Sequence, residues 1–405
     1  LELFQKALIY LSNDLEYFNE FLKKVTTVRS KIVLDEFLSL FDFDAKDSRP
    51  ITLSAHDPLR YIGDVLANVH SSIANEADFV KSLFKFQDKQ IDDAPVTILL
   101  QNKEFLNGLD LKLLNEAVQS LSTSCRIRVE QIVRFEEDPV TNLEIVRLLE
   151  LYQLMFERKG ISLQSSLVSS LEVLEEISKG KITEYFTKVI NKVSPTDNKS
   201  MNDSMPPEWL SDYINKLVEL FEAYDRGNVS DSDEEKPIIS GSFLSKVVEE
   251  PIQAKLIKMI QNEFPLARKS DETRYLLLTM QINCFDLVKS RFSPFATTIF
   301  ALDEESSRIF KKIDDKLKEF INRMLELQEK LLFQNTGMGL YYNLFNMIFP
   351  VSSIQDELDY DMYLSLMDNP LMKLDTIKSK VHDPLNEYLP QALNDLQGNL
   401  LFRLT

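Results

Sequence analysis

Apolar residues recur at alternating steps of three and four positions along most of this chain, and strict apolar-polar alternation is nowhere sustained. Steps of three and four place side chains on one face of an α-helix, whereas strict alternation is typical of a half-buried β-strand. Glycine, on which tight turns and phosphate-binding loops depend, occupies only 9 of the 405 positions. The sequence therefore favours long helices with few connections over a β-rich fold or a nucleotide-binding α/β fold.

A chain of 405 residues is longer than one hydrophobic core usually supports, so we expect two or three packed units. The clearest interruption of the helical pattern is a polar stretch at residues 194–207, which ends in two prolines. The helical pattern resumes at Trp209, the only tryptophan, which we interpret as a packing anchor. The sequence thus predicts two regions of helical bundles, residues 1–205 and residues 206–405.

Two segments, residues 4–25 and residues 310–331, carry apolar residues in a heptad pattern. The positions of the first pattern are Phe4, Leu8, Leu11, Leu15, Phe18, Leu22 and Val25. Each pattern predicts one continuous helix, which packs either inside a bundle of this chain or as a coiled coil against another subunit. The second possibility matters most for the first segment. Because the chain starts at Leu1 rather than at a methionine, we expect it to be part of a longer protein.

Several prolines predict further helix starts. In several cases the residue before the proline is one that commonly caps a helix. Proline in the first helical turn loses no hydrogen bond and already has the helical φ angle. The predicted starts are Asp57-Pro58, Asp138-Pro139, Glu250-Pro251, Ser293-Pro294, Asn369-Pro370 and Asp383-Pro384.

The formal net charge of −18 repels nucleic-acid phosphates and anionic lipid. We therefore expect no nucleic-acid partner and only indirect contact with membranes. The only cysteines, Cys125 and Cys284, have neither metal-binding nor redox spacing, which is typical of a reducing compartment. No apolar run approaches the roughly eighteen residues that a membrane-spanning helix needs.

The sequence predicts no catalytic, cofactor-binding or metal site. None of His56, His70 and His382 has the glutamate three positions earlier that a di-iron bundle needs. Residues 337–339 lack the third glycine of a dinucleotide-binding loop, and phosphate-binding and serine-hydrolase motifs are absent from the sequence.

Residues 56–84 combine a clear helix start with residue types that core packing does not require. The apolar stripe of this helix consists of Leu59, Ile62, Leu66, Val69 and Ile73. Beside it lie Arg60, Tyr61, Gly63 and Asp64, although glycine costs about 1 kcal/mol relative to alanine in a helix interior. The run HDPLRYIGD, followed by a long helix, resembles the signature of the family of subunit six of the conserved oligomeric Golgi complex, in a fungal-like form.

This resemblance implies an all-α fold, an elongated rod of consecutive antiparallel helical bundles, without catalytic activity or cofactors. It further implies a subunit of a vesicle-tethering complex in retrograde intra-Golgi transport, attached peripherally to the cytosolic face of the Golgi membrane. The implied partners are other subunits of the complex, SNARE proteins and Rab GTPases. An α-solenoid adaptor unrelated to trafficking and a helical enzyme of unfamiliar type are the alternatives. A solenoid would show internal repeats of about 30 to 45 residues, and none is visible.

Arg60, Tyr61 and Asp64 are the candidate partner-binding residues. They are also explained by helix packing, because Arg60 and Asp64 form an ordinary i,i+4 pair, and both interpretations can hold together. In the acidic stretch at residues 226–237, Ser230 and Ser232 precede carboxylates that an acidophilic kinase would favour. They are candidate phosphorylation sites, with a solvated charge run as the alternative interpretation.

Overall fold

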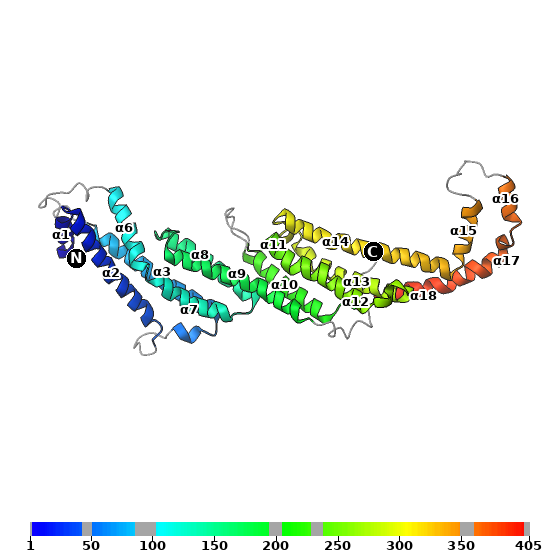
Figure 1. The fold of residues 1–405 in the computed structure, drawn as a ribbon, viewed down its shortest axis with the longest axis horizontal. Helices are drawn as coiled ribbons and strands as arrows, with labels where there is room; N and C mark the ends of the chain where they lie inside the picture. Colours follow the sequence, from blue (N-terminus) through cyan, green and yellow to red (C-terminus); the bar gives the residue numbers. More distant parts are fainter. Residues whose placement is uncertain are drawn as a thin grey trace. The chain divides into compact units, whose positions relative to one another are not determined.

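The computed structural model describes residues 2–42, 51–85, 103–193, 205–227, 238–348 and 360–400. Within these ranges every regular element is a helix and no strand occurs, so the predicted all-α fold class is confirmed. The chain forms two compact units, Leu1–Tyr185 and Phe186–Thr405 (Figure 1). The boundary between the units lies within helix α9, and the division into bundle regions 1–205 and 206–405 stays a prediction.

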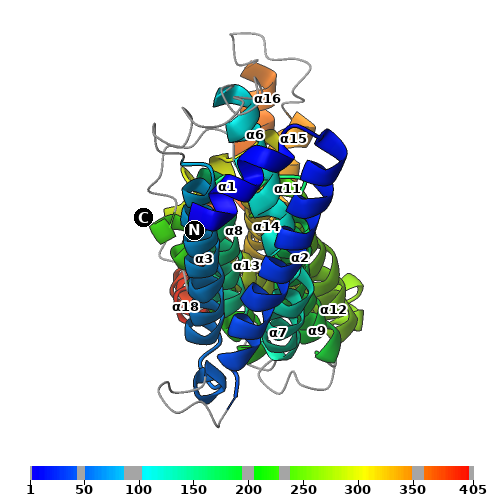
Figure 2. The same cartoon turned by 90° about the vertical axis from the view of Figure 1, so that its left-hand side faces the viewer.

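Unit 1 is built around one central helix, α3, which packs against α2, α6, α7 and α8. Figure 2 faces this unit, with α1, α2 and α3 in front. The elements are α1 (Glu2–Leu11), α2 (Leu15–Ser39), a 3-10 helix (Ile51–Ser54), α3 (Pro58–Leu83), α6 (Lys103–Val118), α7 (Leu121–Phe135), α8 (Pro139–Arg158) and most of α9 (Ser166–Lys192). Ile62, Leu66, Val69 and Ile73 of α3 are fully buried, which confirms that part of the predicted apolar stripe.

The prediction of one continuous helix through residues 4–25 is wrong. α1 ends at Leu11, and α2 starts at Leu15 after a turn. In this turn the Asp14 carboxylate accepts hydrogen bonds from the backbone amides of Glu16 and Tyr17 at 3.0 and 3.4 Å. Such a cap satisfies amides that have no partner within their own helix, and so it favours a new start over a continued helix. As a consequence Leu15 is 54% exposed rather than part of a buried seam.

One ion pair of unit 1 joins α2 to α3. The Arg29 guanidinium donates from Nε to Glu76 Oε1 at 3.0 Å and from Nη2 to Oε2 at 2.6 Å. It also lies 4.3 Å from the centre of the Phe79 ring, an arrangement that favours a cation. The hydrogen bond to Glu76 raises the pKa of Arg29. The α2–α3 contact therefore contains a charge-assisted, bidentate pair.

Asp110 of α6 is a partly buried carboxyl whose Oδ1 atom has no hydrogen-bond partner among the described residues. Burial raises its pKa to about 6, and the positive charge of Lys81 opposes this shift only in part. An ionised carboxylate in this position lowers the stability of the folded state, because its charge is desolvated without full compensation.

We expect Asp110→Asn to stabilise the chain at pH 7.5 and to have little effect at pH 4. The carboxyl of the unfolded chain titrates near 3.8, so between pH 4 and 6 the folded state binds more protons than the unfolded state. Stability therefore falls as the pH rises through this window. The gain at pH 7.5 should be about 1 to 2 kcal/mol, given the partial exposure. Urea unfolding followed by circular dichroism at both pH values measures it.

A second variant should change the stability in the opposite direction. Lys81→Met removes the charge that lowers the pKa of Asp110 and should deepen the loss of stability between pH 4 and pH 7.5. An equal effect of Asp110→Asn at both pH values would show that the pKa of this carboxyl does not differ between the folded and unfolded states.

Unit 2 is organised around the pair α13 and α14, which pack against each other along their length. Its helices are the end of α9, α10 (Glu208–Gly227), α11 (Gly241–Leu244), α12 (Ile257–Glu263), α13 (Asp271–Phe292), α14 (Glu304–Asn335), α15 (Met338–Ile348), α16 (Tyr360–Met367), α17 (Leu374–Ile377) and α18 (Asp383–Asn399). Between them lie 3-10 helices (Pro265–Arg268, Ser293–Phe295, Ile299–Ala301, Pro370–Met372) and π-helices (Ser245–Leu256, Lys378–His382).

The second heptad pattern forms a seam inside this unit. Its positions Ile313, Leu317, Phe320, Met324 and Leu327 are buried on α14. Phe320 meets Phe285 of α13 with ring centres 5.3 Å apart. The bundle interpretation is therefore confirmed for this segment. In α10, by contrast, the expected anchor Trp209 is only half-buried, and the neighbouring Leu210 is fully buried.

The predicted start at Pro251 is wrong, since this proline lies inside a longer helical segment. Pro251 belongs to the π-helix Ser245–Leu256. Proline has no amide hydrogen, so it donates no hydrogen bond to an earlier carbonyl of this helix. In the same segment the hydroxyl of Tyr213 donates to the backbone carbonyl of Val247 at 2.6 Å. The predicted start at Asp383-Pro384 is confirmed, because α18 begins at Asp383 with Pro384 in its first turn, directly after the π-helix Lys378–His382.

Candidate functional site

The candidate site begins at the first turn of α3, where the sequence signature lies. The Asp57 carboxylate accepts a hydrogen bond from the Arg60 amide at 3.1 Å, and Pro58 occupies the first helical turn. This confirms the predicted helix start. At Asp138-Pro139 the same arrangement starts α8, with 2.8 Å between the Thr141 amide and Asp138 Oδ2. The short helix Ile51–Ser54 packs beside this turn of α3.

Arg60 and Asp64 lie one helical turn apart on the solvent side of α3. Their side chains are 70% and 48% exposed, and 4.0 Å separates Arg60 Nε from Asp64 Oδ2. A pair this exposed contributes at most about 0.5 kcal/mol to stability. The fold therefore does not depend on either charge, and both remain accessible to a partner.

Tyr61 points the other way. It is 4% exposed and belongs to the core cluster of unit 1, together with Cys125 and Val129 of α7. Burial raises the pKa of its hydroxyl, against the opposing charge of Arg128. The structure thus brings Arg60 and Asp64 together at the surface and places Tyr61 in the packing between α3 and α7. Partner binding by the three residues stays a prediction.

Packing does not require the glycine of the signature. A Cβ atom at Gly63 would lie 3.9 Å from Leu148 Cδ2 of α8, an ordinary van der Waals contact. The structure therefore offers no steric reason for Gly63.

The described residues contain no group of three or more His, Cys, Asp or Glu side chains placed to hold a metal ion. His70 stacks on Phe156 with ring centres 6.4 Å apart. Burial raises the pKa of Cys125 to about 12 and also raises that of Cys284, so neither thiol ionises near neutral pH. Ser230 and Ser232 lie outside the described residues. No helix in the described ranges has the length and apolarity to span a membrane.

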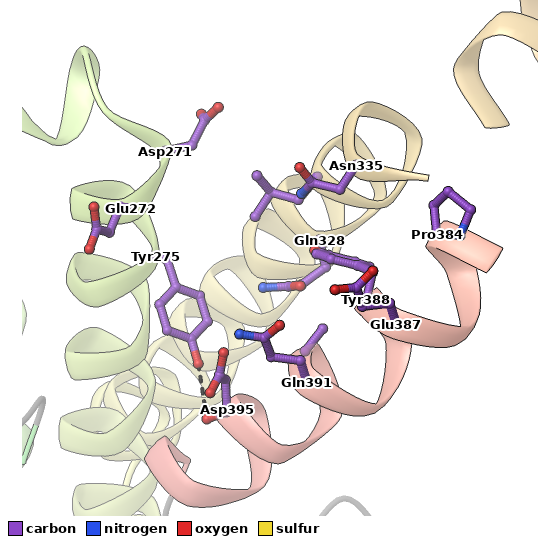
Figure 3. A pocket seen from close by; sticks show the side chains of 12 residues that line it. Asp271, Glu272, Tyr275, Gln328, Asn335, Pro384, Glu387, Tyr388, Gln391 and Asp395 are labelled. Carbon is purple, nitrogen blue, oxygen red and sulfur yellow. Dashed lines mark hydrogen bonds between the residues drawn. The ribbon is translucent and has the colours of Figure 1, made fainter. Parts of the chain in front are cut away.

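The sequence reasoning missed a groove of about 490 Å³ in unit 2 between α13, α14 and α18 (Figure 3). Its walls carry the carboxylates of Asp271, Glu272, Glu387 and Asp395. The Tyr275 hydroxyl donates to the backbone carbonyl of Asp395 at 3.2 Å and joins α13 to α18. The lining comes from three helices that are distant in sequence, so no local motif marks it.

Comparison with known proteins identifies the family. The whole chain, residues 1–405, matches the family described as Conserved Oligomeric Golgi complex subunit 6, C-terminal. Proteins named Conserved oligomeric Golgi complex subunit 6 are similar to it: one from Saccharomyces cerevisiae strain S288c is 58% identical over 408 residues, and one from Vanderwaltozyma polyspora is 57% identical over 405 residues. A more distant one from Meyerozyma guilliermondii is 28% identical over 401 residues.

The alignments to the first two relatives cover 100% of this chain but only 48% and 49% of the relatives, so the chain spans about half the length of the curated relatives that it matches. For the third the shares are 98% and 49%. No solved structure matches the chain. Because the family match covers every residue and the yeast relatives are more than half identical, the chain belongs to the family of conserved oligomeric Golgi complex subunit 6.

Proposed function

We propose that this chain serves as a non-catalytic, helical scaffold within the oligomeric Golgi complex after which its relatives are named. The observation that carries this proposal is the family match along all 405 residues. The function would consist of binding other subunits of the complex at the Golgi, and the α-solenoid adaptor unrelated to trafficking is the competing class.

The finer role follows from the same family. We propose that the protein acts in retrograde intra-Golgi transport, as a peripheral component on the cytosolic side of the membrane. SNARE proteins and Rab GTPases are the proposed partners besides the other subunits. A recovery experiment that returns none of these proteins would contradict this part alone.

Long helices suit such a role for a physical reason. α14 has 32 residues and spans about 48 Å at 1.5 Å per residue. Binding sites at the two ends of a helix this long are held apart at a fixed distance. Two modest contacts can then act together through a high effective concentration, without any chemical step.

The surface that we propose for partner contact in unit 1 is formed by the exposed pair Arg60 and Asp64, held in place by the buried Tyr61. Exposed charges that the fold does not need are available for specificity toward an oppositely charged partner surface. The pair lies on α3, the helix that contacts most of the unit, so its orientation is fixed by extensive packing.

Arg60→Glu combined with Asp64→Ala is expected to leave the fold intact and to reduce the recovery of partner subunits. The change in unfolding free energy should stay below about 0.5 kcal/mol, because the pair is exposed. The full-length protein carrying both substitutions would be purified from cells that lack the unsubstituted copy. Quantitative mass spectrometry of co-purified Golgi-complex subunits, with a thermal melt of the same protein, gives both readouts.

Two controls accompany this experiment. Lys24→Glu with Glu20→Ala alters a comparably exposed i,i+4 pair on α2 and should leave recovery unchanged. Gly63→Ala alters the signature without removing a charge. Unchanged recovery with the Arg60 and Asp64 double variant would place the contact elsewhere. If the unsubstituted protein recovers an unrelated complex, the scaffold proposal itself fails in favour of the adaptor.

A further inference from the structure

Unit 2 contains a further pocket, of about 490 Å³, between α12, α13, α14 and the 3-10 helix Pro265–Arg268. We call it the basic pocket, because four of its described lining residues are cationic and only Asp271 is anionic. The cationic residues are Lys269, Arg274, Arg323 and Lys330. The basic pocket shares only Asp271 with the groove between α13, α14 and α18. Since the chain as a whole carries a net charge of −18, this concentration of positive charge is local.

The lining side chains converge from two packed helices. On α13, Arg274, Leu278 and Gln281 follow one another at steps of four and three, so they share one helix face. On α14, Arg323 and Lys330 are seven residues apart, which places them on one face two turns apart. All five residues line the basic pocket, and α13 and α14 pack against each other. The two faces therefore border the same space.

Two of the four positive charges are not compensated by any described residue. Lys330 is neutralised, because its Nζ atom lies 2.7 Å from Asp271 Oδ2 and 2.9 Å from Oδ1. Arg323 pairs with a glutamate one turn earlier on its own helix. Lys269 and Arg274 form no ion pair with any described residue. The basic pocket therefore attracts an anion with more than one negative charge.

The buried Gln281 provides independent support for a ligand. It lines the basic pocket, is only 2% exposed, and its side chain forms no hydrogen bond with any described residue. Its buried neighbours on α13 are satisfied, since Thr279 donates to the Tyr275 carbonyl at 2.9 Å and Asn283 to the Asn399 carbonyl at 2.8 Å. Buried polar side chains nearly always have such a partner. The Gln281 amide is thus left to donate to, or accept from, a molecule in the pocket.

The size and charge of the pocket fit a small phosphate-bearing molecule. Small-molecule sites typically have volumes of about 300 to 1,000 Å³. A phosphate monoester carries a charge of about −1.5 to −2 at neutral pH, which matches two uncompensated cations better than a single carboxylate does. A guanidinium can also donate two parallel hydrogen bonds to phosphate oxygens. We propose that the basic pocket binds a small organic phosphate, with Lys269 and Arg274 on the phosphate group and Gln281 donating to one of its oxygens.

The remaining walls suit the body of such a molecule. Ala267, Leu277 and Leu278 give the pocket an apolar side. A nucleic-acid strand is disfavoured, because the net charge of the chain repels the phosphates that would extend beyond the pocket. The inference concerns unit 2 and does not depend on the contact proposed for Arg60 and Asp64.

Isothermal titration calorimetry with the 405-residue chain at constant ionic strength tests the chemistry. The probes are pyrophosphate, inositol trisphosphate and, as a carboxylate of comparable charge, citrate. We expect inositol trisphosphate to bind, to raise the unfolding temperature, and to bind at least about tenfold more tightly than citrate. Binding of neither phosphate, or equal binding of citrate, would overturn the proposal.

Substitutions in the pocket locate the binding site, with a thermal melt of each variant to verify folding. Gln281→Glu keeps the side-chain size but adds a negative charge, and it should weaken inositol trisphosphate by at least about tenfold. Gln281→Leu should weaken it several-fold without a change of charge. Lys269→Gln with Arg274→Gln should also cost at least about tenfold. The matched control, Arg308→Gln with Lys311→Gln, removes two exposed charges of α14 and should leave the affinity unchanged. Equal losses in the two double variants would reduce the effect to net charge and contradict the proposal.

A vesicle experiment distinguishes the two possible sources of the phosphate group, a soluble molecule and a lipid headgroup. Phosphatidylcholine vesicles with and without a phosphorylated inositol lipid are sedimented with the full-length protein. Because the net charge opposes anionic membranes, we expect the soluble probe to bind and the vesicles to retain no protein. Retention on the phosphorylated vesicles that Lys269→Gln with Arg274→Gln abolishes would support the same site with a lipid headgroup as its ligand. Binding of neither the vesicles nor inositol trisphosphate would overturn the proposal.

Discussion

Arg29→Met is expected to lower the free energy of unfolding of unit 1 by about 3 to 5 kcal/mol. The reason is that the substitution leaves the buried Glu76 carboxylate without its hydrogen-bond donor. The Glu76 side chain is 1% exposed, and Arg29, itself 27% exposed, supplies its bidentate hydrogen bonds. Without the guanidinium, a charged carboxylate stays in the α2–α3 contact with neither water nor a cation to compensate it.

Urea unfolding of the 405-residue chain measures this loss, and two variants separate its causes. Arg29→Met with Glu76→Leu removes both charges and should recover most of the stability, because replacing a buried pair by apolar residues is often neutral. Lys24→Met breaks the exposed pair with Glu20 on the same helix and should cost at most about 0.5 kcal/mol. A loss below 1 kcal/mol for Arg29→Met alone would show that Glu76 finds water.

Helix existence could be predicted from the sequence wherever the pattern is local. The stripe of α3 and the seam of α14 need only steps of three and four along one segment, and most of their positions are buried as expected. The break at Asp14 was not predicted, because a single capping side chain outweighs a heptad pattern that continues across it. Pro251 was misinterpreted because local spacing does not show that the helical segment Ser245–Leu256 continues through this proline.

For the candidate sites, too, the features that adjacent residues carry could be predicted, and those that depend on distant helices could not. The signature at Arg60, Tyr61 and Asp64 could be found from adjacent residues. That the chain buries only the tyrosine could not be predicted from them. That outcome depends on α7, which packs on α3 and is distant in sequence. The groove between α13, α14 and α18 depends on Tyr275 and Asp395, which are 120 residues apart. Sequence spacing carries no information on such a pair until the helices are placed.

Gly337→Ala is expected to destabilise the segment that leads into α18, one wall of the groove between α13, α14 and α18, by about 2 to 4 kcal/mol. Gly337 links α14 to α15 with φ +66°, a conformation that costs other residues free energy. A Cβ atom there would lie 2.4 Å from the backbone oxygen of Lys380. Because that oxygen belongs to the backbone, no side-chain rotation can relieve the clash. The π-helix Lys378–His382 must move, and α18 continues directly from it.

Amide hydrogen exchange, measured segment by segment, detects this displacement. In Gly337→Ala, amides of residues 374–399 should exchange faster, while those of α3 in unit 1 should be unchanged. Gly398→Ala is the matched control, because a Cβ atom on that helical residue meets nothing within 4 Å and alanine favours the helix. Unchanged exchange in residues 374–399 would show that the Gly337 turn does not position α18.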